Sequence, residues 1–366
     1  MYGGPLHMAC CEGLVDLAKE LIKAGADVNL LAAERAGTPL SSIFVHYRVV
    51  ESSSETKSQL IDILLGAGAD PVTTGGSFDT VAAAAALGGE GIHLSMLASK
   101  GVSFVSSDGM GRQPLHLAAV RGDMEIVSFI LDAGGKATKK DKIERSAISW
   151  AAQGGSIEVL RNLLQHTGDD AVNEPDIDGW TPLHWVSRGV GNAIKSTGGN
   201  QYETIKMLLD RGADRAVNQR INGREYTPES IARYHGCNHD ILNLLASDKE
   251  WNQQPINNSV LQERNSPPIL TNNKRFREDN NWCNFCLFPC NGLRYSCRAC
   301  MDFDLCYKCY SSKDRIHPSD HEFEEIGPEF VVDEVASHSR SPSPKSSLDE
   351  ASSSSDSDSD DEDGDE

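Results

Sequence analysis

Along the first two thirds of the chain, apolar positions come in pairs of short helical patterns that recur about every 33 residues. The three clearest copies start at Pro5, Pro114 and Pro182, each within a Pro-Leu-His run. In each copy a second pattern follows and ends in an apolar pair shortly before a glycine. Each copy therefore predicts two helices joined by a tight turn.

Weaker copies fill the gaps and begin near Thr38, Thr80, Ser146 and Thr227. Together they predict seven units between about residues 3 and 248. Two units are stretched, around Arg48–Ser58 and Gly189–Gln201, and both stretches are expected between the helices of their unit. Growth of a tolerated loop is the favoured interpretation, and the alternative is that these loops shape a binding face.

The residues at the start of each unit have a physical role. In Thr-Pro, the proline suits the first helical turn and the preceding hydroxyl caps the helix. Small Ala-Ala pairs keep the first helix thin, so that units can stack, and no unit buries its apolar face alone. These motifs resemble the ankyrin repeat. The resemblance implies a curved α-solenoid, and it implies that His7, His116 and His184 tie neighbouring loops by hydrogen bonds.

Composition narrows the class of protein. The chain has 366 residues, 39% of them hydrophobic, and lacks an apolar run of membrane-spanning length or a secretion signal. A repeat motif begins within the first few residues, at Gly4-Pro5, so a further segment upstream of this sequence is compatible with the pattern. The net charge is -20, and ten acidic residues lie among the last 18. We therefore expect no membrane or nucleic-acid partner, a monomer, and an intracellular location, cytoplasmic or nuclear.

Seven of the ten cysteines lie between Cys283 and Cys309. Three C-x-x-C pairs are followed by His317-x3-His321, which supplies eight ligands, enough for two tetrahedral zinc ions. Cys290 is left over, as a spare thiol or a substitute ligand, and the spare thiol is favoured. Cys10 and Cys11 fall in a repeat helix and are expected to be buried in the core.

The segment from Gly292 to Cys309, with its Asp-Phe-Asp-Leu-Cys run, resembles the ZZ-type zinc finger. The resemblance implies two structural zinc ions with interleaved ligands. The first ion would be held by Cys283, Cys286, Cys306 and Cys309, and the second by Cys297, Cys300, His317 and His321. Neither site keeps a place for a water, which argues against catalysis by the metal.

Some ZZ fingers bind protein N-termini through an acidic pocket. The resemblance places Asn284, Asp302 and Asp304 at such a pocket here, although Asn284 stands where an aspartate is frequent. The alternative is that the two aspartates cap a local turn.

Trp150 and Trp185 are predicted on first helices, where they would line a concave groove or pack between units. Trp180 is predicted at a loop tip, either exposed as a binding hot spot or packed between units.

We therefore predict a mainly α protein. An ankyrin solenoid covers residues 1–248, a polar linker 249–279, a ZZ finger 280–328 and a disordered Ser/Asp-rich tail 329–366. No phosphate loop, nucleophile elbow or H-E-x-x-H motif occurs, so an enzyme is not expected. The function hypothesis is a zinc-binding adaptor between proteins. The alternatives are a nuclear regulator that binds histone tails and a non-catalytic component of a ubiquitin or autophagy pathway.

Overall fold

The chain divides into two units, Met1–Val331 and Val332–Glu366. The computed structural model describes residues 3–32, 37–45, 53–76, 78–189, 200–221, 224–246, 282–287, 290, 294–300 and 303–326, all in the first unit. The predicted linker and the whole predicted tail lie outside the described residues, and so does Asp302.

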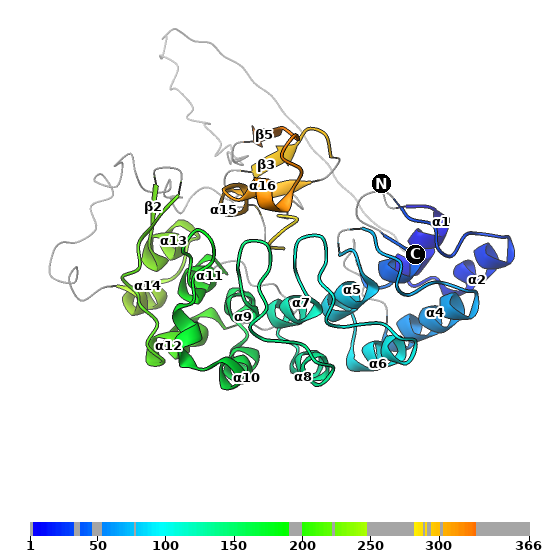
Figure 1. Cartoon of the computed structure of the whole chain (residues 1–366), viewed down its shortest axis with the longest axis horizontal. Coiled ribbons are helices and arrows are strands. Elements are labelled where there is room, and N and C mark those ends of the chain that lie inside the picture. Colours follow the sequence, from blue (N-terminus) through cyan, green and yellow to red (C-terminus); the bar gives the residue numbers. More distant parts are fainter. Residues whose placement is uncertain are drawn as a thin grey trace, which may run out of the picture. The chain divides into compact units, whose positions relative to one another are not determined.

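The described residues of the repeat region form seven successive helix pairs, here called units 1 to 7 (Figure 1). They are α1 (Pro5–Cys11) with α2 (Val15–Lys23), α3 (Pro39–Ser42) with α4 (Ser54–Gly66), α5 (Val81–Gly88) with α6 (Gly91–Ser99), α7 (Pro114–Arg121) with α8 (Met124–Asp132), α9 (Ala147–Gly154) with α10 (Ile157–Thr167), α11 (Pro182–Gly189) with α12 (Gln201–Asp210), and α13 (Pro228–Tyr234) with α14 (His239–Leu245). A 3₁₀ helix, η1 (Asp169–Asn173), follows α10, and the hairpin β1 (Gln219–Ile221) and β2 (Arg224–Tyr226) precedes α13.

Capping fixes where the first helices begin. The hydroxyl of Thr38 accepts a hydrogen bond from the amide of Ser41 at 3.2 Å, and Thr227 caps α13 in the same way. The predicted role of the repeat histidines is confirmed at two positions. Nε2 of His7 bonds the carbonyl of Gly37 at 3.1 Å, and Nε2 of His116 bonds that of Lys139 at 3.0 Å. Each bond ties one unit to the loop that precedes the next unit.

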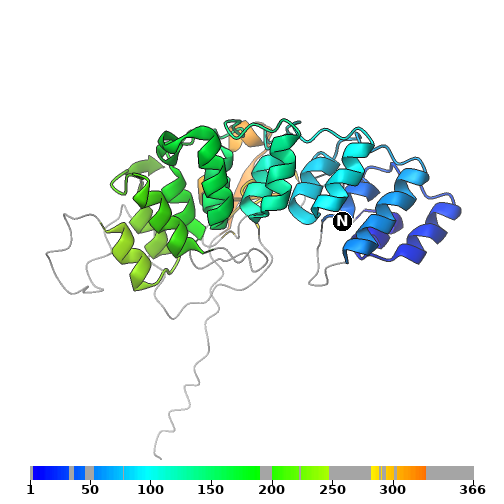
Figure 2. The same ribbon diagram turned by 90° about the horizontal axis from the view of Figure 1, so that it is seen from below.

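The two helices of each unit lie in separate rows (Figures 1 and 2). First helices pack against first helices in chain order, and close approach demands small residues there. In α5 every side chain from Val81 to Ala86 is buried. A Cβ added at Gly154, on α9, would lie 2.1 Å from the carbonyl oxygen of Val120 on α7. Glycine is therefore required at this contact because the backbones of two units meet there.

The stretched units differ in outcome. In unit 2 the helix α4 already begins at Ser54, capped by Ser53, so the C-terminal part of the predicted loop is helical. The reason is local, because Ser53 is a good N-cap and acidic Glu55 suits the first turn. In unit 6 the stretch falls between α11 and α12 as predicted, and its residues 190–199 lie outside the described part.

The C-terminal finger contains a three-stranded antiparallel sheet in the order β4-β3-β5. Its elements are β3 (Arg294–Cys297), β4 (Asp304–Cys306), the short helices α15 (Tyr307–Tyr310) and α16 (Lys313–Ile316), and β5 (Phe323–Ile326). In the part of the chain that the structure describes, no helix is long and apolar enough to cross a membrane.

Candidate functional site

One group of four cysteines is fully buried and is assembled from three parts of the finger. Cys283 and Cys286 come from the loop before the sheet, Cys306 ends β4, and Cys309 lies in α15. All four sulfur atoms lie within 4.8 Å of one another, and Sγ of Cys286 is 3.9 Å from Sγ of Cys306. The amide of Cys309 donates to Sγ of Cys306 at 3.4 Å, so the backbone helps to hold a charged sulfur.

The second group contains two cysteines and two histidines. Cys297 ends β3 and Cys300 follows it, while His317 and His321 flank the turn between α16 and β5. Nε2 of His317 lies 3.2 Å from Sγ of Cys297, and Nδ1 of His321 lies 3.3 Å from Sγ of Cys300. The ring of Phe303 stacks on His317 with centroids 4.0 Å apart and fixes the orientation of that imidazole.

These distances fit two tetrahedral zinc ions. Zinc bonds of about 2.3 Å to sulfur and about 2.0 Å to nitrogen place two thiolates about 3.8 Å apart, and a thiolate and an imidazole nitrogen about 3.6 Å apart. The two groups are the same two sets of four that the resemblance implied, and the prediction of two structural zinc ions is confirmed. Four protein ligands close each site, so the ions would act by holding the finger together. Cys290 belongs to neither group.

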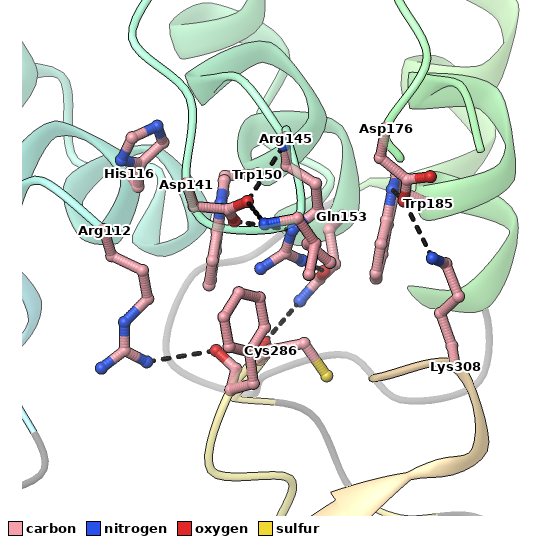
Figure 3. Close-up of polar contacts among 12 residues, drawn as sticks. Arg112, His116, Asp141, Arg145, Trp150, Gln153, Asp176, Trp185, Cys286 and Lys308 are labelled. Carbon is pink, nitrogen blue, oxygen red and sulfur yellow. Dashed lines mark hydrogen bonds and ion pairs between the residues drawn. The ribbon is translucent and has the colours of Figure 1, made fainter. Parts of the chain in front are cut away.

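The loop of the first metal group rests on the ankyrin repeats. Nη1 of Arg112 donates to the carbonyl oxygens of Asn284 and Phe285 at 3.2 and 3.1 Å. Nε2 of Gln153 donates to the carbonyl oxygen of Cys286 at 2.8 Å (Figure 3). The Phe285 side chain is fully buried. Three consecutive carbonyl groups of the finger therefore find donors on the repeats, which satisfies backbone acceptors that would otherwise be buried alone.

Arg188, on α11, touches the metal group itself. Its Nη1 lies 3.0 Å from Sγ of Cys286. Burial tends to lower the pKa of Arg188, but the thiols of Cys286 and Cys306 outweigh it and hold the pKa well above its usual value. Four thiolates around one Zn²⁺ carry a net charge of about -2. A buried guanidinium at this distance therefore compensates charge at the metal site as well as donating a hydrogen bond.

A second connection runs through Lys308, on α15 between two cysteine ligands of the first group. Its Nζ lies 3.2 Å from Oδ2 of Asp176 (Figure 3). The same ammonium group also bonds Asp178. The hydroxyl groups of Ser311 and Ser312 donate to the same carboxylate of Asp178, at 2.8 and 3.2 Å. Burial acts to lower the pKa of Lys308, but the two carboxylates raise it above its usual value.

Of the three residues predicted at the peptide pocket, the structure describes two and brings them together. Oδ1 of Asn284 accepts the amide of Asp304 at 2.8 Å, and the amide of Asn284 donates to the carbonyl of Asp304 at 2.9 Å. The Asp304 carboxylate pairs with Arg294 at 3.4 Å, and its side chain is 10% exposed. Asn284 therefore joins the loop of the first metal group to the start of β4. Asp302 lies outside the described residues.

The three tryptophans are all fully buried, so the exposed loop-tip alternative for Trp180 is wrong. Trp180 packs against Trp185 at a centroid distance of 5.2 Å and against Tyr226 at 5.9 Å. Nε1 of Trp150 donates to Asp141 at 3.0 Å. Nζ of Lys308, in the finger, lies 5.3 Å from the centroid of the Trp180 ring. The finger therefore contributes to the burial of this aromatic group.

Sequence reasoning missed Arg112, Gln153, Arg188 and Lys308. A signal for two of them was present. Gln153 and Arg188 occupy the same position of their first helices, where unit 4 has Val120. A polar residue at a position that is apolar in a neighbouring unit indicates that something other than the next repeat is contacted there.

Fold and site together define an ankyrin-repeat array that carries a ZZ-type zinc finger. Family models described as "Ankyrin repeat" and "Ankyrin repeats (3 copies)" match residues 4–32 and 122–215, and one described as "Zinc finger, ZZ type" matches residues 278–319. The recognition made from the sequence motifs is thereby confirmed.

Similar proteins share the repeat region only distantly. Ankyrin repeat domain-containing protein SAT10 of Stachybotrys chartarum is 24% identical over 55% of this chain and 11% of its own length. Inversin of Canis lupus familiaris is 27% identical over 52% of this chain and 17% of its own length. The probable 26S proteasome regulatory subunit p28 of Saccharomyces cerevisiae is 25% identical over 59% of this chain and 95% of its own length. The chain therefore spans less than a fifth of the length of the first two relatives.

Proposed function

We propose that this protein is a zinc-binding adaptor whose ankyrin repeats bind a protein partner and whose ZZ finger provides a second recognition surface. Both kinds of module serve protein interaction, which supports the general assignment. The finger contacts units 4 to 7, so the partner surface is assigned to the repeats that precede them.

One observation carries this proposal. Exposed apolar side chains occur in three successive connections between units. Leu30 and Leu31 precede unit 2, Val72 precedes unit 3, and Val105 precedes unit 4, with exposed fractions of 48, 51, 63 and 39%. Single exposed apolar residues need no explanation, but their recurrence at the same place in neighbouring units supports a protein contact.

Quantitative affinity purification from cells of the source organism tests this surface. Proteins enriched on the wild-type chain should be lost from the double variant Leu31→Lys/Val72→Lys, because two ammonium groups would be desolvated in the contact. The control variant is Leu17→Lys, which changes an equally exposed leucine on α2, in the other row of helices. Equal enrichment on all three chains would contradict the proposed surface.

Recognition of protein N-termini by the finger is the finer part of the proposal. Oδ1 of Asp304 is buried and accepts no hydrogen bond within the described residues, which supports a carboxylate oxygen beside Asn284 that an incoming amine would pair with. Peptides with a free N-terminus should bind the full chain and their acetylated forms should not. The variant Asp302→Ala should abolish the difference, and unchanged binding would remove the idea.

A second candidate is a non-catalytic role in a ubiquitin pathway. The name of one relative favours it, a probable 26S proteasome regulatory subunit that this chain matches over 95% of that subunit's length. Proteasome subunits should then be enriched in the same purification. The nuclear alternative depends on a short basic run in the linker, Lys274-Arg275-Phe276-Arg277, and on the acidic tail, and both lie outside the described residues.

A further inference from the structure

An ion pair between an aspartate and an arginine recurs in the loops that precede the first helices of units 4 and 5. In unit 4, Oδ2 of Asp108 accepts Nε of Arg112 at 2.6 Å, and in unit 5, Oδ2 of Asp141 accepts Nε of Arg145 at 2.9 Å. Both aspartates also accept the backbone amide of the residue four positions later. Aspartate and arginine thus form a closed pair within the same loop.

Unit 6 repeats the loop but not the cation. Oδ1 of Asp176 accepts the backbone amide of Trp180 at 2.9 Å, so the turn is the same. Trp180, however, occupies the position that Arg112 and Arg145 hold in units 4 and 5, and an indole has no charge. Nε1 of Trp185 donates to Asp176 Oδ2 at 3.2 Å, which leaves the negative charge uncompensated within the unit's own loop.

The finger supplies this cation. Lys308 reaches Asp176 from α15, and neither side chain is exposed. It lies 5.3 and 5.7 Å from the rings of Trp180 and Trp185, which is within range of a cation–π interaction. A lysine 132 positions away in sequence therefore takes the role that an arginine plays in the two preceding units (Figure 3).

The first helices of units 5 to 7 also differ from those of the preceding units, at one position that contacts the finger. Counted from the first residue of each first helix, the seventh position in units 1 to 4 is Cys11, Val45, Leu87 or Val120, and Val45 lies beyond the end of α3. In units 5 to 7 it is Gln153, Arg188 and Tyr234, and each of these contacts the finger. The change from apolar to polar or aromatic residues coincides with the three units whose first helices contact the finger, whereas unit 4 contacts it through Arg112 in the preceding loop.

From these contacts we propose that units 4 to 7 form a dedicated binding site for the chain's own ZZ finger, with Lys308 completing the charge set of unit 6. The finger is then an internal ligand of the solenoid. While it is seated, the carbonyl groups of Asn284, Phe285 and Cys286 and the face of α15 that carries Lys308 are withheld from other proteins. The finger side that carries the Cys297 and His321 group forms none of the contacts described above.

A cleavable linker tests the proposal in the full chain. A protease site is inserted between residues 249 and 279, the zinc-loaded protein is cut, and the pieces are applied to a gel-filtration column at micromolar concentration. The wild-type pieces should co-elute. Lys308→Glu should weaken their association at least about tenfold, since it places like charges beside Asp176 and Asp178.

Two further variants guard against a trivial loss of folding. Lys313→Glu alters another lysine of the finger, one that pairs with Asp314, and should leave co-elution unchanged. Asp178→Lys changes the repeat side, away from the metal ligands, and should weaken association, while combining it with Lys308→Glu should restore part of it. Zinc content of two per chain in every variant shows that the finger is folded.

Separation of the wild-type pieces would overturn the proposal, and so would co-elution of the Lys308→Glu and Asp178→Lys pieces as tightly as wild type. The adaptor function is measured separately, through capture of a partner by the uncovered repeats. If partner capture fails, the docking result is unaffected. If the pieces fail to associate, the adaptor function is likewise unaffected.

Discussion

The variant Asp141→Ala removes the centre of the most enclosed ion pair in the repeats. The Asp141 carboxylate accepts four hydrogen bonds, from the amides of Ile143 and Arg145, from Nε of Arg145 and from Nε1 of Trp150, all between 2.9 and 3.0 Å. The side chains of Asp141 and Arg145 are both fully buried. Alanine would leave a buried guanidinium without its counter-ion.

The expected loss is large because the penalty is mainly that of an uncompensated charge. Removing one partner of a buried pair costs about 3–5 kcal/mol, a large share of the roughly 5–15 kcal/mol that stabilises a typical domain. Replacing both partners by apolar residues is often close to neutral. The double variant Asp141→Ala/Arg145→Met should therefore be more stable than Asp141→Ala alone, with the remaining deficit reporting the lost loop hydrogen bonds.

Urea unfolding of the full zinc-loaded chain, followed by far-ultraviolet circular dichroism, measures this difference. The matched control is Asp70→Ala, an exposed aspartate in the connection before unit 3 whose carboxylate accepts the amide of Val72 at 3.0 Å and the hydroxyl of Thr73 at 2.9 Å. Its loss should cost about 1 kcal/mol or less. Equal shifts of the unfolding midpoint for Asp141→Ala and Asp70→Ala would refute the reasoning.

Three other outcomes can be checked. Gly154→Ala should destabilise the repeats in urea unfolding by about 1–3 kcal/mol, since the new Cβ would lie 2.1 Å from a backbone oxygen, whereas Gly66→Ala, with open space around it, should stabilise α4 by about 0.5–1 kcal/mol. Burial lowers the pKa of His184 to about 4, below the usual 6.5, so its contribution to stability should fall as pH drops from 6.5 towards 4, and His184→Gln should show a shallower acid dependence of the urea midpoint. A strong chelator should remove two zinc ions per chain, measured by elemental analysis, and should raise amide hydrogen exchange in β3 to β5 while the helical circular dichroism of the repeats persists.

Local and periodic features could be predicted from the sequence. The period gave seven units, Thr38 and Thr227 marked helix starts, and the spacing from Cys283 to His321 gave eight metal ligands. These predictions succeed because each feature is determined by residues that are close in sequence or by a pattern that recurs from repeat to repeat. Cys10 and Cys11 are buried as expected for the same reason.

The contact between finger and repeats could not be predicted in this way. Lys308 sits in a short stretch between two cysteines, and nothing near it in sequence indicates a buried ammonium group. Its partner Asp176 lies in a loop that looks like those of units 4 and 5. That loop differs from them by Trp180 in place of an arginine and by Asp178 in place of Met110 or Ile143. The meaning of both differences depends on a residue more than a hundred positions away.

The seated finger also changes how the array should unfold. In a solenoid, each repeat contacts only its neighbours, so opening at one end progresses unit by unit. Here a single small body is bonded to Arg112 in unit 4, Gln153 in unit 5 and Arg188 in unit 6, and packs on Tyr234 in unit 7. Opening any of these units breaks contacts that the other three share through the finger. Units 4 to 7 should therefore form one cooperative folding block clamped by zinc, while units 1 to 3 keep the freedom to fray separately.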